Sequence, residues 1–345
     1  MIRTHLGLAV GAMLGLGACY GSVEPPGPLY VADGPEHSVS ARSSTPASDD
    51  DEAPVPDANT FDHGLADSLT STGSPDGAAG CGKIDFLFVV DNSLSMEREQ
   101  ENLSTSFPGF MQVIDENVRA KDFHVMVVDT DALSAADGDP ARATRESVAD
   151  AACGAQLGAG KRLDATGQDC GIRGGTRYMA PDQPDLFGTF ACLGQVGTNG
   201  NAYERPMEAL LEATSPDFVR PGGCNSQFLR SDAVLVVTIV TDEDDSRSPG
   251  TPESWRQALL EVKGGDPKAI VVLALVGDDN VPGGLPGGPC SSGEAEGSPI
   301  LQGFAESFAF GSLGAICAYD YAPFFGAAVN VIGQACNGFV APEIR

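Results

Sequence analysis

The stretch that decides the fold is IDFLFVV (residues 84–90), which runs directly into DNSLS (residues 91–95). Most of the first seven residues are β-branched or aromatic, and this composition predicts a buried strand. Residues 96–116 then carry apolar side chains at helical spacing, which predicts a helix. We therefore expect a folded region to begin with a strand, a short polar loop and a helix.

Three further apolar runs follow the same rhythm, at residues 123–128, 233–240 and 269–276. Each run ends close to an aspartate, and a helical segment at 254–262 separates the last two. Near-continuous Val, Ile and Leu strands that alternate with helices are typical of a parallel sheet covered on both faces. The predicted fold class is α/β, with a doubly wound, mostly parallel sheet flanked by helices.

Polar residues stand directly after two of these strands. Asp91, Ser93 and Ser95 follow the first strand, and Asp242 follows the third. Ligands of open parallel sheets bind outside the carboxyl ends of the strands, and carboxylate and hydroxyl oxygens suit a hard divalent cation. Residues 91–95 could instead cap the following helix, since Asp and Ser are good N-caps, but a cap leaves Asp242 without a role.

These residues resemble the von Willebrand factor A domain with its metal-ion-dependent adhesion site, over roughly residues 81–280. The resemblance implies one bound ion, Mg²⁺ or else Mn²⁺ or Ca²⁺, with Asp91 and Asp242 supplying charge directly or through water. It also implies hydroxyl ligands from Ser93, Ser95 and a threonine in a loop before a helix. Thr198, ahead of the helical residues 204–211, is the chosen threonine. The alternatives for this third hydroxyl are Thr189, Thr176 and Thr130.

The resemblance further implies that an open coordination position on the ion accepts a carboxylate from a partner protein, in adhesion or in the assembly of an envelope complex. The neighbouring acids Glu243, Asp244 and Asp245 are interpreted as a solvated acidic loop, with an outer role around the ion as the alternative.

Two other functions compete with this one: a metal-assisted hydrolase of the envelope, and a structural spacer with a degenerate site. The hydrolase lacks an evident base, because the sole histidine of the predicted folded region, His124, lies inside the second strand. GAGKR (residues 158–162) lacks the spacing and the hydroxyl residue of a phosphate-binding loop. We therefore expect a protein that is not an enzyme.

The chain of 345 residues has 20 Lys and Arg against 48 Asp and Glu, a formal charge of −28. Such a balance excludes nucleic acid as a partner, because binding phosphates requires a basic face. The negative charge also repels other acidic proteins at long range. The partner's carboxylate that binds the ion is therefore expected to lie in a basic or neutral part of the partner's surface.

Residues 1–19 are predicted to be a lipoprotein signal peptide. An apolar stretch of signal-peptide length ends in LGAC (residues 16–19), which resembles the lipobox of bacterial lipoproteins. Cys19 would then be the lipid anchor, and the anchor the only membrane contact; a plain secretory signal is the alternative. The protein is expected to be exported to the bacterial cell envelope, and Tyr20 in place of Asp favours the outer over the inner membrane.

Residues 20–80 contain eleven acidic residues and one arginine, with many Pro, Ser and Gly, and are predicted to form an acidic disordered tether. The domain is expected at 81–345, with an insertion at about 131–200 and a C-terminal helical layer at about 281–345. An even cysteine set in an exported chain predicts up to four disulfides. Proximity favours Cys153 with Cys170 and Cys317 with Cys336, among 105 pairings. The full set is Cys81, Cys153, Cys170, Cys192, Cys224, Cys290, Cys317 and Cys336.

Overall fold

The centre of the fold is a parallel sheet, seen in a computed structural model that describes residues 81–131, 153–154, 156–200, 203–278 and 284–342. Within these residues the strands lie in the order β2-β1-β3-β4-β5, and every neighbouring pair is parallel. Their bounds are β1 (Lys83–Val90), β2 (Asp122–Asp129), β3 (Val234–Val240), β4 (Ile270–Val276) and β5 (Gly311–Ala315). The predicted α/β class is confirmed, and the first four strands agree with their predicted ranges to within one residue.

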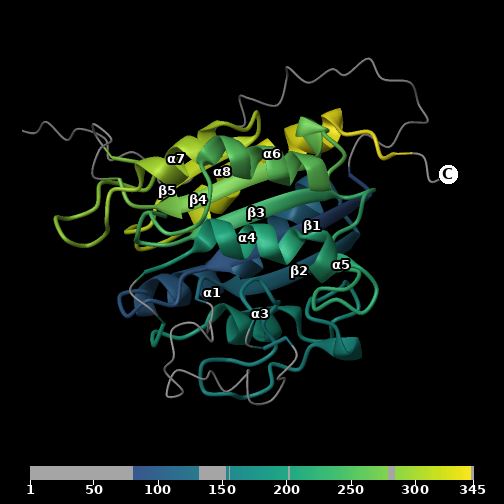
Figure 1. The fold of residues 1–345 in the computed structure, drawn as a ribbon, viewed down its shortest axis with the longest axis horizontal. Helices are drawn as coiled ribbons and strands as arrows, with labels where there is room; N and C mark the ends of the chain where they lie inside the picture. Colours follow the sequence, from purple (N-terminus) through teal and green to yellow (C-terminus); the bar gives the residue numbers. More distant parts are fainter. Residues whose placement is uncertain (1–80, 132–152, 155, 201–202, 279–283, 343–345) are drawn as a thin grey trace, which may run out of the picture. The chain divides into compact units, whose positions relative to one another are not determined.

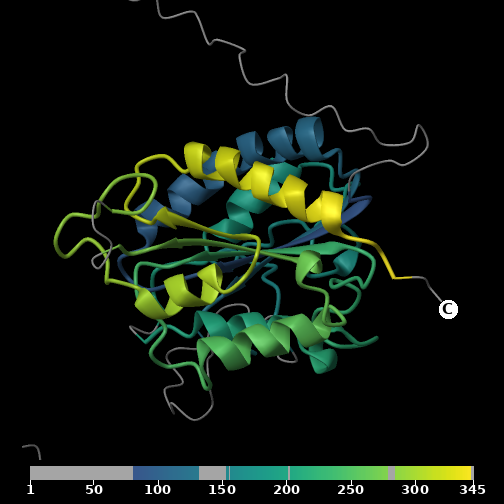
Figure 2. The same cartoon turned by 90° about the horizontal axis from the view of Figure 1, so that it is seen from above.

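Helices cover both faces of this sheet, as Figures 1 and 2 show. One face carries α1 (Glu97–Val113), which ends in a π-helical turn (Ile114–Val118), and α8 (Ala322–Gly338). The other face carries α4 (Pro206–Thr214), α6 (Pro252–Val262) and α7 (Pro299–Glu306). Short helical pieces complete the fold at α5 (Pro216–Val219), η3 (Arg173–Gly175) and η4 (Pro267–Ala269). The sheet is therefore doubly wound, as predicted.

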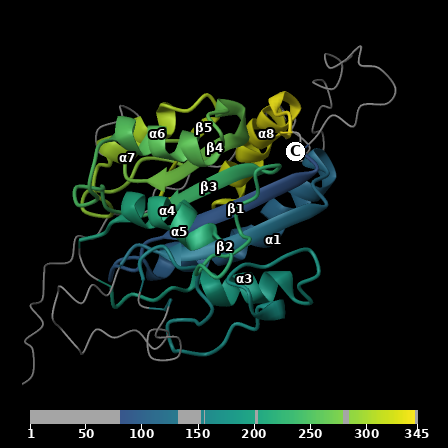
Figure 3. The same cartoon turned by 45° about the vertical axis from the view of Figure 1, so that its right-hand side comes forward.

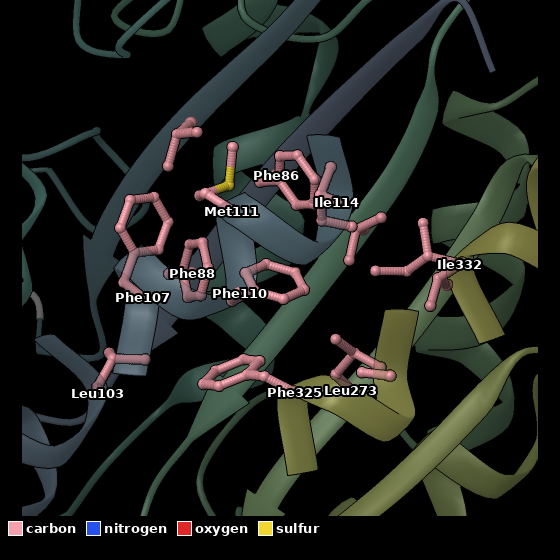
Figure 4. Packing of buried hydrophobic residues seen from close by; sticks show 14 of the residues in the cluster. Phe86, Phe88, Leu103, Phe107, Phe110, Met111, Ile114, Leu273, Phe325 and Ile332 are labelled. Carbon is pink, nitrogen blue, oxygen red and sulfur yellow. The ribbon is translucent and has the colours of Figure 1, made fainter. Parts of the chain in front are cut away.

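Side chains of β1 alternate between two hydrophobic clusters, one on each face. Phe86 and Phe88 pack toward α1 and α8, and Leu87 and Val89 pack toward the opposite helices. The ring of Phe110 in α1 contacts both the sheet and α8, with its centroid 5.6 Å from Phe86 of β1 and 4.8 Å from Phe325 of α8 (Figure 4). Because both faces of β1 are buried, side chains on either face must be apolar, and this run therefore has almost no polar residue.

The edge strand β5 corrects the prediction that residues 281–345 form only a helical layer. Its sequence, GSLGA, lacks the β-branched residues that signal a strand, and it forms by pairing with β4. Gly314 allows α8 to approach closely, because a Cβ at this position would lie 2.5 Å from the ring of Phe324. The predicted buried face of α8 is confirmed, since Phe324, Phe325 and Val329 are all buried.

The insertion covers the β2 edge of the sheet, as Figure 3 shows for α3 (Leu186–Gly194). The Phe190 ring stacks on that of Phe107 in α1, with centroids 3.6 Å apart, and Met179 forms an antiparallel bridge with Val125 of β2. The sequence showed no long periodic run here because α3 has only nine residues. Covering an edge strand in this way blocks pairing with other chains.

Four disulfides join all eight cysteines of the domain, which confirms the predicted number. The two pairings favoured by proximity are wrong, because the partners are chosen by neighbours in the fold rather than along the chain. Cys81, before β1, meets Cys336 near the end of α8, and Cys153 of the insertion meets Cys224 after α5. The pairs are Cys81–Cys336, Cys153–Cys224, Cys170–Cys192 and Cys290–Cys317.

None of the helices in the described part of the chain has the length and apolar composition needed to cross a membrane. The predicted signal peptide, Cys19 and the tether at 20–80 lie outside the described residues.

Candidate metal centre

The loop after β1 fixes the carboxylate of Asp91 from two sides. Its Oδ1 accepts a hydrogen bond of 2.6 Å from the main-chain N–H of Ser93, and its Oδ2 accepts one of 2.6 Å from the hydroxyl of Thr241. The Asp91 N–H donates to the carbonyl of Val240, at 3.0 Å, at the end of β3. Because β1 and β3 are parallel neighbours, the loop of one strand is held by the end of the other.

Ser93, Ser95 and Asp242 meet beside Asp91. The two serine Oγ atoms are 3.2 Å apart. Burial raises the pKa of Asp242, and hydrogen bonding to the hydroxyls of Ser95 and Ser93 partly offsets that effect. Asp242 Oδ1 is buried without a hydrogen-bond donor from the described residues. A buried carboxylate oxygen without a donor is unfavourable, and a bound cation would remove the penalty.

The loop that carries Thr198 packs against the loop of Asp91. The side-chain amide of Gln100 donates to the carbonyls of both Asp91, at 2.9 Å, and Gly197, at 2.8 Å. The N–H of Gly200 donates to the carbonyl of Asn92, and a Cβ on this glycine would lie 2.2 Å from the Asn92 side chain. The chosen threonine therefore stands in a segment that directly adjoins the candidate site.

The three alternative threonines have other hydrogen-bond partners. The hydroxyl of Thr189, in α3, accepts a bond from Gln183, and that of Thr176 donates to the carbonyl of Tyr178. Both of these contacts lie within the insertion. Thr130, directly after β2, donates its hydroxyl hydrogen to the carboxylate of Glu204.

Glu204 is a member of the site that the sequence analysis did not single out. It is 2% exposed, and one carboxylate oxygen, Oε1, has no donor among the described residues. Burial raises its pKa to about 10, and the charges of Asp91, Asp131 and Glu243 add to that effect. In the sequence Glu204 looks like an ordinary residue before a helix, and only the fold places it beside Asp91.

Negative charge accumulates at this end of the sheet. Burial raises the pKa of Asp91 to about 6, and the charge of Asp242 acts in the same direction. Burial likewise raises the pKa of Glu243 to about 7, with contributions from Asp91, Asp242 and Glu296. In the described part of the chain, no Lys, Arg or His forms an ion pair with Asp91 or Asp242. The residues present therefore suit a divalent cation, which would neutralise this charge.

The donor set combines hydroxyls with carboxylates. Among the described residues, no group of three or more His, Cys, Asp or Glu is arranged to hold a metal ion. Two aspartates and two serines instead supply the oxygens that converge here. Such a set suits hard cations such as Mg²⁺, which keep several water ligands when bound to proteins.

Asp244 and Asp245 cap helices, which corrects the interpretation of residues 243–245 as a solvated acidic loop. Asp244 accepts hydrogen bonds from the N–H groups of Ile300 and Leu301, at the start of α7. Asp245 is 2% exposed and accepts from the N–H of Met207, at the start of α4. Neither helix has a side-chain cap from its own N-cap residue, so a distant loop supplies both.

Replacing Asp245 with alanine is expected to lower the free energy of unfolding by about 2 kcal/mol, the upper end for a lost N-cap. The aspartate also accepts bonds from the N–H and hydroxyl of Ser248, so several donors would lose their partner. Denaturant unfolding of the metal-free protein measures this change. A variant that keeps wild-type stability would contradict the capping role.

The residues considered for catalysis lie elsewhere, His124 on β2 and Lys161 in the insertion against that strand. His124 Nδ1 is 2.8 Å from the carbonyl oxygen of Phe228, its ring packs against Tyr178, and burial lowers its pKa to about 4. Lys161 donates to the carboxylate of Asp129 at 2.9 Å in a buried ion pair. The histidine is packed in the strand, as expected, and the lysine has a structural partner.

Solved structures similar to this chain include three of proximal thread matrix protein 1 (PTMP1) from the mussel byssus. Its crystal form 2 has a TM-score of 0.37 and 11% identity, over 74% of this chain and 48% of that chain. A second structure has a TM-score of 0.35 and 14% identity, over 75% and 47%. A third, described as having a zinc-occupied MIDAS motif, has a TM-score of 0.33 and 12% identity, over 75% and 47%.

The chain thus spans about half the length of these proteins. No protein-family model matches the chain, and no curated protein matches it. The fold assignment rests on the strand order and register of the chain itself. By these it is a doubly wound, parallel α/β domain with a carboxylate and hydroxyl site at the carboxyl ends of β1 and β3.

Proposed function

We propose that this domain binds a protein ligand through a divalent cation held by Asp91, Ser93, Ser95 and Asp242. The observation that carries the proposal is that these side chains come together at a site where a buried Asp242 oxygen has no donor among the described residues. The resemblance of the DNSLS loop and Asp242 to the metal-ion-dependent adhesion site supports the same function.

A bound Mg²⁺, Mn²⁺ or Ca²⁺ would supply an electrophilic position that accepts a carboxylate oxygen of the partner. Asp91 and Asp242 hold the negative charge that attracts the ion, while the serine hydroxyls contribute oxygens without further charge. Thr198 is the proposed third hydroxyl, and Gln100 positions its loop through the bonds to Asp91 and Gly197. Zn²⁺ is a further ion to test, since one mussel structure is described with zinc in its MIDAS motif.

The proposed setting is the bacterial cell envelope, with the outer membrane favoured. The lipobox-like LGAC supports an anchor at Cys19, and the acidic composition of residues 20–80 supports a tether that holds the domain away from the membrane. Such an arrangement is compatible with adhesion and with assembly of an envelope complex. The identity of the bound partner protein distinguishes the two roles.

Capture of envelope proteins on the immobilised chain tests this function. We expect a protein that binds in Mg²⁺ or Mn²⁺, elutes with EDTA, and is absent from a matrix that carries Asp242→Asn. Mass spectrometry of the two eluates identifies it. Identical eluates from both matrices would reject a cation-dependent protein ligand. Hydrolysis of a phosphoester or peptide by the chain, abolished when EDTA removes the metal, would favour the hydrolase instead.

The stability of the metal-free protein is expected to fall by about 2 kcal/mol between about pH 6.5 and about pH 8. The pKa of Glu204 rises from 4.5 to about 10 on folding, so over this range the folded state keeps a proton that the unfolded state releases. Stability from such a proton is complete below about pH 4.5 and declines as the pH rises toward 10.

Denaturant unfolding in EDTA measures this decline, and Glu204→Gln is the matched control that should remove most of it. The chosen range avoids two opposing groups. The pKa of His124 is lowered to about 4, so this residue adds stability as the pH rises from about 4 to 6.5. The pKa of Lys263 is lowered to about 8, so this residue adds stability as the pH rises above about 8. Equal slopes for the wild type and the variant would contradict the prediction.

A further inference from the structure

Large apolar side chains are exposed around the candidate cation site. Leu94 is 82% exposed and stands between Ser93 and Ser95, the two serines of the site. Tyr203 is 59% exposed and directly precedes Glu204, whose carboxylate lies beside Asp91. Burying such side chains against a partner is favourable, and tyrosine is enriched among the residues that dominate binding energy. The surface around the ion therefore has contact area to offer besides the ion itself.

An arginine lies against one of these side chains. The guanidinium carbon of Arg247 is 3.9 Å from the centroid of the Tyr203 ring, so a cation–π contact with the ring holds the guanidinium in place. Arg247 is exposed, and no carboxylate among the described residues pairs with its guanidinium. Its main-chain N–H bonds to Asp245, the buried cap of α4, which ties the base of the side chain to the fold. A guanidinium held in this way offers two parallel N–H donors to a carboxylate.

The α1 side of the site differs in charge. Arg98 also lies over a tyrosine, Tyr319, at 5.3 Å, but it donates to the carboxylates of Glu99, at 2.8 Å, and Glu294, at 2.9 Å. Its charge is therefore already satisfied within the chain. Arg247, in contrast, has no carboxylate partner in the described ranges although it lies next to a site of several acids, and charge complementarity favours a second carboxylate as its partner.

We propose that Leu94, Tyr203 and Arg247 form, with the cation, a docking surface for a protein segment that carries two acidic side chains and a bulky apolar one. The first carboxylate binds the cation, the second binds the guanidinium of Arg247, and the apolar side chain packs on Leu94 and Tyr203. The first contact rests on the proposed function. The second and third are properties of this chain's own loops, and they make the surface selective among acidic segments.

The test selects dodecapeptides from a random library displayed on phage, on the immobilised full chain in Mn²⁺, with elution by EDTA. Selected peptides are then synthesised and titrated by fluorescence polarisation against the wild type, Arg247→Ala and Leu94→Ser. Arg256→Ala is the matched control, because Arg256 also lies over an aromatic ring, that of Phe308, but on α6. Calorimetric titration of Mn²⁺ into each variant shows whether the cation is still bound.

We expect peptides with two acidic residues, and a loss of affinity of about tenfold to a hundredfold in Arg247→Ala with unchanged Mn²⁺ affinity. Replacing the second acid of the peptide by glutamine should weaken binding to the wild type but not to Arg247→Ala, as a double-mutant cycle requires for a direct pair. Leu94→Ser should weaken binding more for peptides with a larger apolar side chain, and Arg256→Ala should leave the affinity for every peptide unchanged.

Two outcomes overturn the inference and can be told apart. Peptides that elute with EDTA but bind Arg247→Ala and Leu94→Ser as tightly as the wild type reject this docking surface and leave the proposed function standing. A selection that yields no EDTA-eluted peptide, together with no Mn²⁺ binding by the wild type, rejects the proposed function and the docking surface with it.

Discussion

Replacing Asp242 with asparagine is expected to abolish saturable binding of Mg²⁺ and Mn²⁺ to the oxidised chain, a loss in affinity of at least about a hundredfold. The side chain keeps its size but loses the charge and one of the oxygens that face Ser93 and Ser95. Calorimetric titration of each ion into the wild type and the variant measures the effect. Asp91→Asn should have the same effect on the ion, and in addition it weakens the hydrogen bond from Thr241.

The fold should survive the Asp242 substitution, which makes the loss of binding interpretable. Burial raises the pKa of Asp242, so its charge is unfavourable in the metal-free state, and the neutral asparagine should leave stability in EDTA unchanged or slightly higher. Asp217→Asn, at an exposed carboxylate on α5, is the matched control and should bind ions like the wild type. Wild type that fails to bind any of the ions would reject the site and favour the spacer interpretation.

Removing the disulfide between Cys81 and Cys336 is expected to cost about 5 kcal/mol of stability. The bond closes a loop with a sequence separation of 255 residues, and the cost of closing a loop without the bond grows with its length. It also ties the start of β1, the central strand that ends at the site, to the far end of α8. Denaturant unfolding of a variant with both cysteines replaced by alanine measures this loss.

The bond between Cys170 and Cys192 supplies the comparison, because it closes a separation of only 22 residues within the insertion. The corresponding double alanine variant should lose about 3 kcal/mol. Both variants keep the other three disulfides, so the difference between them reports loop length. Equal losses, or a larger loss for the short loop, would show that the long-range bond acts on a denatured state that is already constrained.

The strands and the first half of the site could be predicted from the sequence because their signals are local. A strand buried on both faces requires a nearly continuous apolar run, and residues 84–90 are such a run apart from Asp85. Parallel strands place their carboxyl ends at one edge of the sheet, so Asp91 and Asp242 could be assigned to one site from their positions alone. The boundaries of the first four strands followed from the same runs.

Local patterns failed where a residue depends on a neighbour that is distant in the chain. β5 is a strand because it pairs with β4, although its composition argues against one. Asp244 and Asp245 look like a solvated acidic loop, yet each caps a helix from another part of the chain. Their carboxylates take partners that no spacing in the sequence reveals.

The sequence by itself determined a doubly wound sheet, a set of eight cysteines in the domain that follows residue 80, and a carboxylate and hydroxyl loop at the end of its first strand. Only the tertiary structure decided which cysteines pair, that Thr241 holds Asp91, and that Glu204 lies in the same acidic cluster. The physical reason is range. Periodicity and composition act over a few neighbouring residues, whereas disulfides, buried charges and helix caps depend on which distant segments the packing of the two faces brings together.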